Sequence, residues 1–124
     1  MLYQPPKNIE DYILSKKGAE KSFPFGEEAA VYKVKNKMFA LIGKMGLNLK
    51  CDPDEAILWR SMYDGITPAY HMNKEHWNSI TLDASIPKDS VPEDLVQKMI
   101  DDSYDLVVKK LSKKDRATLL GGFK

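Results

Sequence analysis

Residues 29–51 read AAVYKVKNKMFALIGKMGLNLKC, and this stretch predicts an antiparallel meander of three strands. Over residues 29–35, alternate residues share a face, as in a strand with one buried face. Asn36 suits the left-handed backbone of a tight turn. The apolar run 38–42 is typical of a central strand buried on both faces, and a glycine-bounded turn follows it. Alternation returns over residues 47–51, which predict the third strand.

Helical signals flank this meander on both sides. Asn8 is suited to cap a helix over residues 9–17. Asp52 precedes a proline, and this pair is a strong helix start, because aspartate accepts the first amide hydrogen bonds and proline fits the first helical position. A long helix is expected over residues 92–111, with one continuous apolar face. That face consists of Val96, Met99, Ile100, Ser103, Val107 and Leu111.

The remaining segments predict one further strand, two loops and a free end. A strand is expected over about 77–82, after a loop around residues 67–68. Phe23 and Phe25 flank a proline in a turn and are expected to anchor that turn in the core. Residues 121–124 are expected to fray. The predicted fold is therefore α+β, with an antiparallel sheet packed against an N-terminal, a middle and a long C-terminal helix.

Length and composition indicate one globular domain over residues 1–124. Hydrophobic residues make up 43% of the chain and charged residues 30%, unlike the apolar-poor composition of disordered chains. No apolar run approaches the roughly 20 residues that cross a bilayer, and the N-terminus lacks the apolar stretch of a signal peptide. We therefore expect a cytoplasmic protein without membrane contact.

The cysteine and histidine content predicts no catalytic or metal site. The single cysteine, Cys51, excludes an intrachain disulfide, and it alternates with leucines on an apolar strand face, where thiols are usually inert. His71 and His76 lie five residues apart, whereas a helical zinc pair is spaced by four, and no further ligands complete a set. The alternative is that both histidines support a loop that Trp77 anchors. We therefore expect no enzyme, no metal and no cofactor.

Several short motifs, in this order, resemble the MmcQ/YjbR family of small bacterial proteins. They are SFPFG at 22–26, AVYKV at 30–34, KMFA at 37–40, LKCDP at 49–53, GITPAYHMNK at 65–74, HW at 76–77 and SY at 103–104. Together they extend over about residues 9–115. The resemblance implies a compact fold of the CyaY-like, or double wing, type, and a DNA-binding activity that is proposed from analogy with that fold. It implies no catalytic residues, and Ala69 departs from the glycine that is common at its position.

The charge distribution adds a basic region to this resemblance, although the formal net charge is only +1. Residues 1–50 contain nine lysines and five acidic residues, residues 51–90 three basic and seven acidic ones, and residues 91–124 seven basic and six acidic ones. The first third of the chain is thus able to present a basic surface. The alternative is an ordinary solvated surface with uneven local charge.

Three lysines of the predicted hairpin are the leading candidates for a DNA interface. Lys33 and Lys35 share a strand face and Lys37 follows the turn, so the hairpin is able to track phosphates. The full candidate set is Lys33, Lys35, Lys37, Lys50, Arg60, Lys74 and His76. Because the chain offers few arginines to read guanine, we expect DNA binding to be electrostatic, weak and salt-dependent. The alternative is that these lysines protect an edge strand from aggregation.

A second hypothesis places the function in the 63–77 loop. Tyr63, Tyr70, Met72 and Trp77 supply aromatic and thioether surface there, which suits a protein partner or a small ligand. Exposure separates the two interpretations of this loop. Buried side chains would make it structural, whereas an open pocket lined by them would favour binding.

Overall fold

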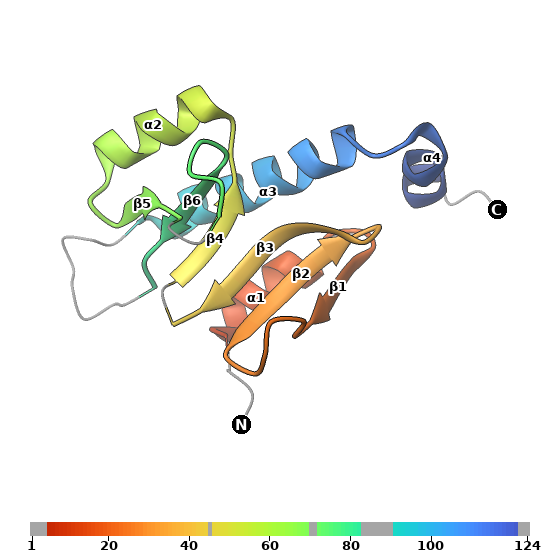
Figure 1. Ribbon diagram of the computed structural model, residues 1–124, viewed down its shortest axis with the longest axis horizontal. Helices are drawn as coiled ribbons and strands as arrows, with labels where there is room; N and C mark the ends of the chain where they lie inside the picture. Colours follow the sequence, from red (N-terminus) through yellow and green to blue (C-terminus); the bar gives the residue numbers. More distant parts are fainter. Residues whose placement is uncertain (1–4, 45, 70–71, 83–90, 122–124) are drawn as a thin grey trace.

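One antiparallel sheet of six strands organises the protein (Figure 1). The computed structural model describes residues 5–44, 46–69, 72–82 and 91–121. Along the chain its elements are α1 (Lys7–Leu14), β1 (Ala19–Ser22), β2 (Ala29–Val34), β3 (Lys37–Gly43), β4 (Gly46–Lys50), α2 (Pro53–Met62), β5 (Ile66–Pro68), β6 (Trp77–Ile80), α3 (Glu93–Lys109) and α4 (Lys113–Gly121). The strands lie in the order β1-β2-β3-β4-β6-β5. The predicted α+β class and meander are confirmed.

The helices α1, α2 and α3 cover one face of this sheet. Helix α3 packs on β2, β3 and β4, whereas α2 packs on β5 and β6 and α1 on β1 (Figure 1). Strand residues on the covered face are buried with the predicted face of α3, in one hydrophobic core. None of the helices in the described ranges has the length and apolar content needed to span a membrane.

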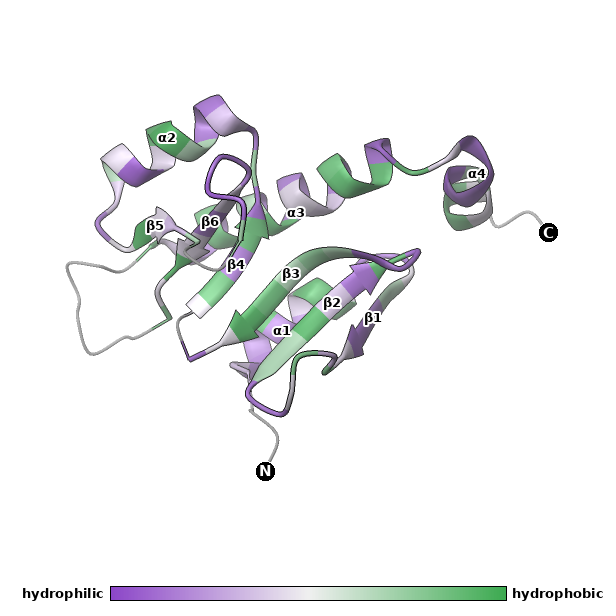
Figure 2. Cartoon of the chain, in the orientation of Figure 1, coloured by the Kyte–Doolittle hydropathy of each residue, from purple (hydrophilic) through white to green (hydrophobic). Residues whose placement is uncertain are grey.

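The β2–β3 hairpin follows the sequence closely. Lys35 and Asn36 both have positive φ, at 48° and 66°, as a two-residue hairpin turn requires. This turn is hydrophilic, whereas β3 and most of β4 are hydrophobic (Figure 2). At the start of β4, Gly46 has φ +117°, and a Cβ placed there would collide with the carbonyl oxygen of Ile80. Only glycine therefore allows β6 to approach this closely.

The side chain of Ser103 joins α3 to the sheet where β3 and β4 separate. The ladder between these strands ends at the pair Ala40–Leu49. Immediately beyond that pair, the fully buried Ser103 hydroxyl donates to the Phe39 carbonyl at 2.6 Å and accepts from the Lys50 amide at 2.9 Å. One hydroxyl thus satisfies both backbone groups that would otherwise lack a partner.

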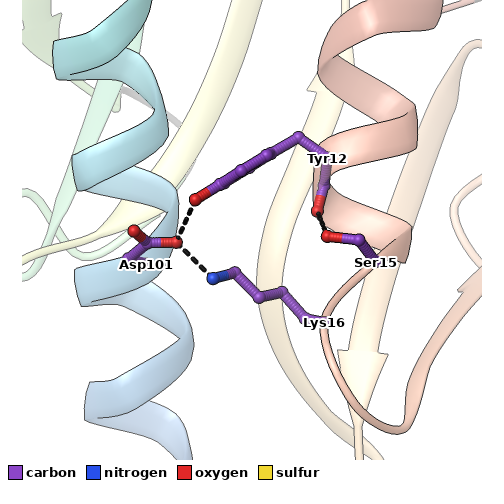
Figure 3. A network of polar contacts seen from close by, with 4 residues as sticks. All are labelled: Tyr12, Ser15, Lys16 and Asp101. Atoms are coloured by element: carbon purple, nitrogen blue, oxygen red, sulfur yellow. Dashed lines mark hydrogen bonds and ion pairs between the residues drawn. The ribbon is translucent and has the colours of Figure 1, made fainter.

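A polar network, partly buried, ties α1 and the residues just after it to α3 (Figure 3). The Tyr12 hydroxyl donates to Asp101 at 2.7 Å, and the Lys16 ammonium forms an ion pair with the same carboxylate. The hydrogen bond to Asp101, followed by burial, raises the pKa of Tyr12. Lys16 also lies over the Tyr12 ring, 5.0 Å from its centroid. These contacts fix the position of the first helix.

Several boundaries differ from prediction at the ends of the chain. Helix α1 begins at Lys7, with Pro6 and not Asn8 at its N-cap. Helix α3 ends at Lys109 and not at residue 111, and a further helix, α4, occupies residues for which no element was predicted. Gly121 closes α4, while the rest of the predicted tail lies outside the described residues.

Two strands and one side chain were also mispredicted. The loop around residues 67–68 contains strand β5, and β1 was not predicted, because both are short strands held mainly by pairing. Strand β6 ends at Ile80, two residues before the predicted end. Phe23 packs against the core as expected, but Phe25 is 70% exposed, so the expectation that it anchors the turn was wrong.

We expect the substitution Ser103→Ala to lower the free energy of unfolding by about 1–3 kcal/mol, because it leaves a buried carbonyl and a buried amide unpaired. Urea denaturation measures this change. Ser61→Ala is the matched control, since the exposed Ser61 also donates to a helix carbonyl, that of Leu58. The control should stay within about 0.5 kcal/mol of the parent. Equal effects of the two substitutions would refute the bridging role.

Candidate functional site

The hairpin lysines form the first group of candidate residues. Lys33 lies opposite Glu20 on one side and Met38 on the other, on the sheet face away from the helices. Lys35 was expected to share a strand face with Lys33, but β2 ends at Val34 and Lys35 lies in the turn with φ 48°, while Lys37 is exposed at the start of β3. Within the described ranges, none of these three lysines forms an ion pair. The turn that they flank lies toward α4 (Figure 1).

Lys50, Lys74 and His76 form a second group at the end of β4 and the start of β6. Lys50 is the strand partner of Trp77, and the next residue, Cys51, donates its amide to the His76 carbonyl at 2.7 Å. Lys50 also forms no ion pair within the described residues. The seven candidates therefore lie in two groups, at the ends of β2–β3 and of β4–β6.

Arg60 joins the second group but serves the fold. Its Nη2 donates to the carbonyl of Lys74 at 2.7 Å, and its Nε donates to Oδ1 of Asn78 at 2.8 Å. Asn78 is fully buried and in turn donates to the Ala56 carbonyl of α2. The guanidinium thus links α2 to β6 and to the loop before it.

Lys110, which follows α3, is a cation that the sequence-based candidate set missed. Burial and then the nearby charge of Lys110 lower the pKa of Lys50. These two ammonium groups therefore lie close enough to repel each other. The sequence does show a cluster of lysines at the C-terminal end of a predicted helix. That cluster is explained equally well by favourable interaction with the helix dipole, so it did not single out Lys110.

An acidic crevice lies between α2 and α3. Its volume is about 320 Å³, and it is lined by Cys51, Asp52, Glu55, Lys98, Asp102, Asp105, Leu106 and Lys109. Lys98 forms an ion pair with Asp102 at 2.7 Å. In the described part of the chain, no three His, Cys, Asp or Glu side chains are arranged to hold a metal ion. The crevice therefore offers carboxylates but no metal site.

A larger groove occupies the face of the sheet that the helices leave open. It has a volume of about 910 Å³, within the usual range of ligand pockets. Its floor crosses four strands through the paired residues Leu41, Asn48, Ser79 and Thr67. Apolar side chains, mainly Phe25, Met38, Met72 and Trp77, form its walls.

Some side chains of the 63–77 loop line the groove, whereas others pack in the core. Met72 lines the groove and is partly exposed, whereas Trp77 also lines it but is only 9% exposed, so this ring serves mainly to anchor the loop. Tyr63 instead packs against the core and supports the fold. Tyr70 and His71 lie outside the described residues.

Comparisons with known proteins converge on one family. The family model for YjbR matches residues 14–106. The Escherichia coli O157:H7 protein YbdF is 37% identical over 107 residues, which are 83% of this chain and 84% of YbdF. The YjbR protein of E. coli K12 is 30% identical over 113 residues, 88% of this chain and 92% of its own. Both relatives are described as uncharacterized.

Two crystal structures resemble this chain. Deinococcus radiodurans protein DR2400, described with a DUF419 domain, superposes with a TM-score of 0.80 and 32% identity, over 91% of this chain and 86% of its own. A Pseudomonas syringae protein superposes with a TM-score of 0.68 and 26% identity, over 83% of this chain and 98% of its own. These likenesses agree with the α+β fold described above.

We expect Cys51 to react slowly with alkylating reagents. Burial, and then the charges of Glu55 and Asp102, raise the pKa of its thiol to about 11, so only about one molecule in a thousand carries the thiolate at pH 8. Alkylation by iodoacetamide, followed by mass spectrometry, should be roughly 100-fold slower than in guanidinium-unfolded protein. The rate should rise about tenfold per pH unit between pH 8 and 10. Fast labelling of the folded protein at pH 7 would contradict this assignment.

Proposed function

The chain belongs to the YjbR family, and on that premise we propose that it is a non-catalytic module that binds DNA through its phosphates. One observation carries the proposal. Lys33, Lys35, Lys37 and Lys50 form no ion pairs within the described residues, whereas Lys7, Lys16, Lys21 and Lys98 all do. The unpaired ammonium groups keep their charge available for an anionic polymer.

The repulsion between Lys50 and Lys110 supports the same proposal. Burial, and then the nearby charge of Lys110, lower the pKa of Lys50 in the free protein. A phosphate bound at Lys50 would offset both effects and favour the charged form of Lys50. Since α3 carries Lys110 to the end of β4, the helix adds a cation next to the second group of candidates.

The arginines favour binding without sequence preference. The chain contains two arginines, Arg60 and Arg116. Arg60 is held by a backbone carbonyl and by Asn78, and Nη2 of Arg116 donates to the carbonyls of Lys109 and Leu111. Both guanidiniums are therefore engaged by the fold and are poorly placed for bidentate contact with guanine. We infer that phosphate contacts dominate and that affinity falls steeply with salt.

The acidic crevice limits where DNA would lie. Asp52, Glu55, Asp102 and Asp105 line it together with only two lysines, so phosphates are repelled from the side between α2 and α3. DNA would instead cross the β2–β3 hairpin and the end of β4.

A second candidate function, the binding of a small ligand, is favoured by the groove alone. Its volume of about 910 Å³ would accept a molecule of ordinary metabolite size. Glu28 and Lys44 both line it, so its charge does not single out an anion or a cation.

We expect the double substitution Lys33→Gln and Lys37→Gln to weaken DNA binding and flatten its salt dependence. Fluorescence anisotropy with labelled duplex DNA, over a series of salt concentrations, measures both effects. The slope of log K against log salt should fall by about 0.9 for each phosphate that the variant no longer neutralises. The matched control, Lys7→Gln with Lys98→Gln, removes the same charge from lysines that are paired with carboxylates.

The parent protein should show saturable binding at tens of micromolar in low salt, which is the range of non-specific DNA binders. Absence of such binding would refute the proposed function. Equal losses of affinity in the hairpin variant and in the control would show that net charge alone matters and would remove the hairpin from the interface.

A further inference from the structure

We propose that the groove on the open face of the sheet holds an unpaired base of single-stranded DNA. This inference rests on the proposed DNA binding and specifies the form of DNA that the site prefers. It joins the groove to the cations beside it in one site, with the base in the groove and its phosphates on the lysines.

Asn48 supplies a polar group that is poised for a ligand in an otherwise apolar groove. The residue is only 9% exposed and lies in the groove floor. Its Nδ2 donates to the Leu41 carbonyl at 3.3 Å, while its Oδ1 has no hydrogen-bond partner within the described part of the chain. Among the described residues, the buried side-chain polar atom without a partner is Nε of Arg116, so Oδ1 of Asn48 is reached by solvent and is free to accept from a ligand. The ring N–H of thymine, or the amino group of another base, would satisfy it.

The walls of the groove suit the flat face of a base. Trp77 and Met38 line it on the side where Lys50 and Lys33 are their strand partners. Phe25 stands at the groove and is 70% exposed, the highest fraction among the exposed large hydrophobic residues described. An aromatic ring held this far out of the core has most of its surface free to stack. Stacking on such rings tolerates any base, because every base has a π-face.

The charges around the groove orient the DNA backbone. Met38 lies between the strands of Lys33 and Lys50, so both lysines flank the same end of the groove. At the other end, one acidic and one basic residue, Glu28 and Lys44, both line the groove. Phosphates are therefore favoured at the Lys33–Lys50 end, whereas the opposite charges of Glu28 and Lys44 give the other end no net preference. A strand entering with its phosphates on the lysines would direct its base along the groove floor.

This geometry favours single-stranded DNA over duplex. In a duplex each base is paired and stacked, so it would have to be flipped out before it could enter the groove. An unpaired strand presents its bases without that cost. Duplex DNA would contact only the lysines, through its phosphates, as in the proposed function.

The first test compares a labelled 20-nucleotide oligo-dT with a duplex of the same length at one salt concentration. Oligo-dT should bind more tightly. Phe25→Ala should weaken oligo-dT binding roughly 5- to 20-fold, leave duplex binding unchanged and leave the salt slope unchanged, because it removes stacking but no charge. Ile57→Ala is the control, since this α2 residue is 63% exposed, lies outside the groove, and should change neither affinity. Circular dichroism should show that both variants stay folded.

A second measurement reports on Trp77 directly. The chain has two tryptophans, so in a Trp59→Phe background the emission comes from Trp77 alone. Oligo-dT should quench this emission with the same midpoint as the anisotropy titration. Thymidine monophosphate should need at least a hundredfold higher concentration, because it lacks the neighbouring phosphates.

The outcomes separate this inference from the proposed function. If duplex and oligo-dT bind equally and Phe25→Ala changes neither, the groove proposal fails while phosphate binding stands. If neither DNA binds, both fail. Equal quenching by the monophosphate would show a small-ligand site in place of a strand site. A change in oligomeric state with Phe25→Ala, by light scattering and without loss of DNA binding, would show a self-association face and overturn the proposal.

Discussion

The hydroxyl of Ser103 is the contact on which the arrangement of the sheet depends. It stands where β3 and β4 stop pairing, and it relays a hydrogen bond from the Lys50 amide to the Phe39 carbonyl. A larger or apolar side chain there would leave two buried backbone groups unpaired, a cost that usually exceeds the gain from one good hydrogen bond. Because the serine belongs to α3, the same contact sets where the long helix lies on the sheet. The divergence of the two strands and the docking of α3 are therefore one structural feature.

The open face of the sheet follows from this arrangement. Beside Ser103, the register between β2 and β3 shifts by one residue, so that Phe39 is an additional residue of β3 with no partner in β2. In such a bulge two successive residues turn to the same side, and both Phe39 and Ala40 enter the core. Met38 is thereby directed to the open face, where it lines the groove. With the helices on the covered face, the opposite face keeps a concave surface beside unpaired lysines.

Local signals predicted the elements that depend on local chemistry. The positive φ of Asn36, the capping of α2 by Asp52 and the buried face of α3 were all readable, because each depends on neighbours within four residues. Helix α4 carried a readable signal as well. Its Ser112 accepts the Asp115 amide at 3.1 Å, and a serine followed three residues later by an acid is a known helix start.

Features that depend on distant partners were not readable. Strands β1 and β5 are short and have little periodicity, so their pairing with longer neighbours decides their conformation. Alternation placed Asn48 on the polar face, yet the residue is largely buried by side chains of the neighbouring strands. Arg60 looked like a free cation in sequence, but its partners, Lys74 and Asn78, lie 14 and 18 residues away. The structure was therefore required to distinguish charged side chains that are held by hydrogen bonds within the fold from those that are not.

The near-neutral total charge is compatible with DNA binding because the charges are separated in space. Carboxylates gather in the crevice between α2 and α3, whereas the lysines on the hairpin and at the end of β4 form no ion pair with any residue that the structure describes. At 0.1 M salt the Debye length is about 10 Å, so the crevice would act mainly on phosphates near Lys50, which adjoins Cys51 in the crevice wall. At lower salt the crevice would repel the polymer over a longer range. The acidic side would then act less on the strength of binding than on its orientation, turning the open face of the sheet toward the DNA.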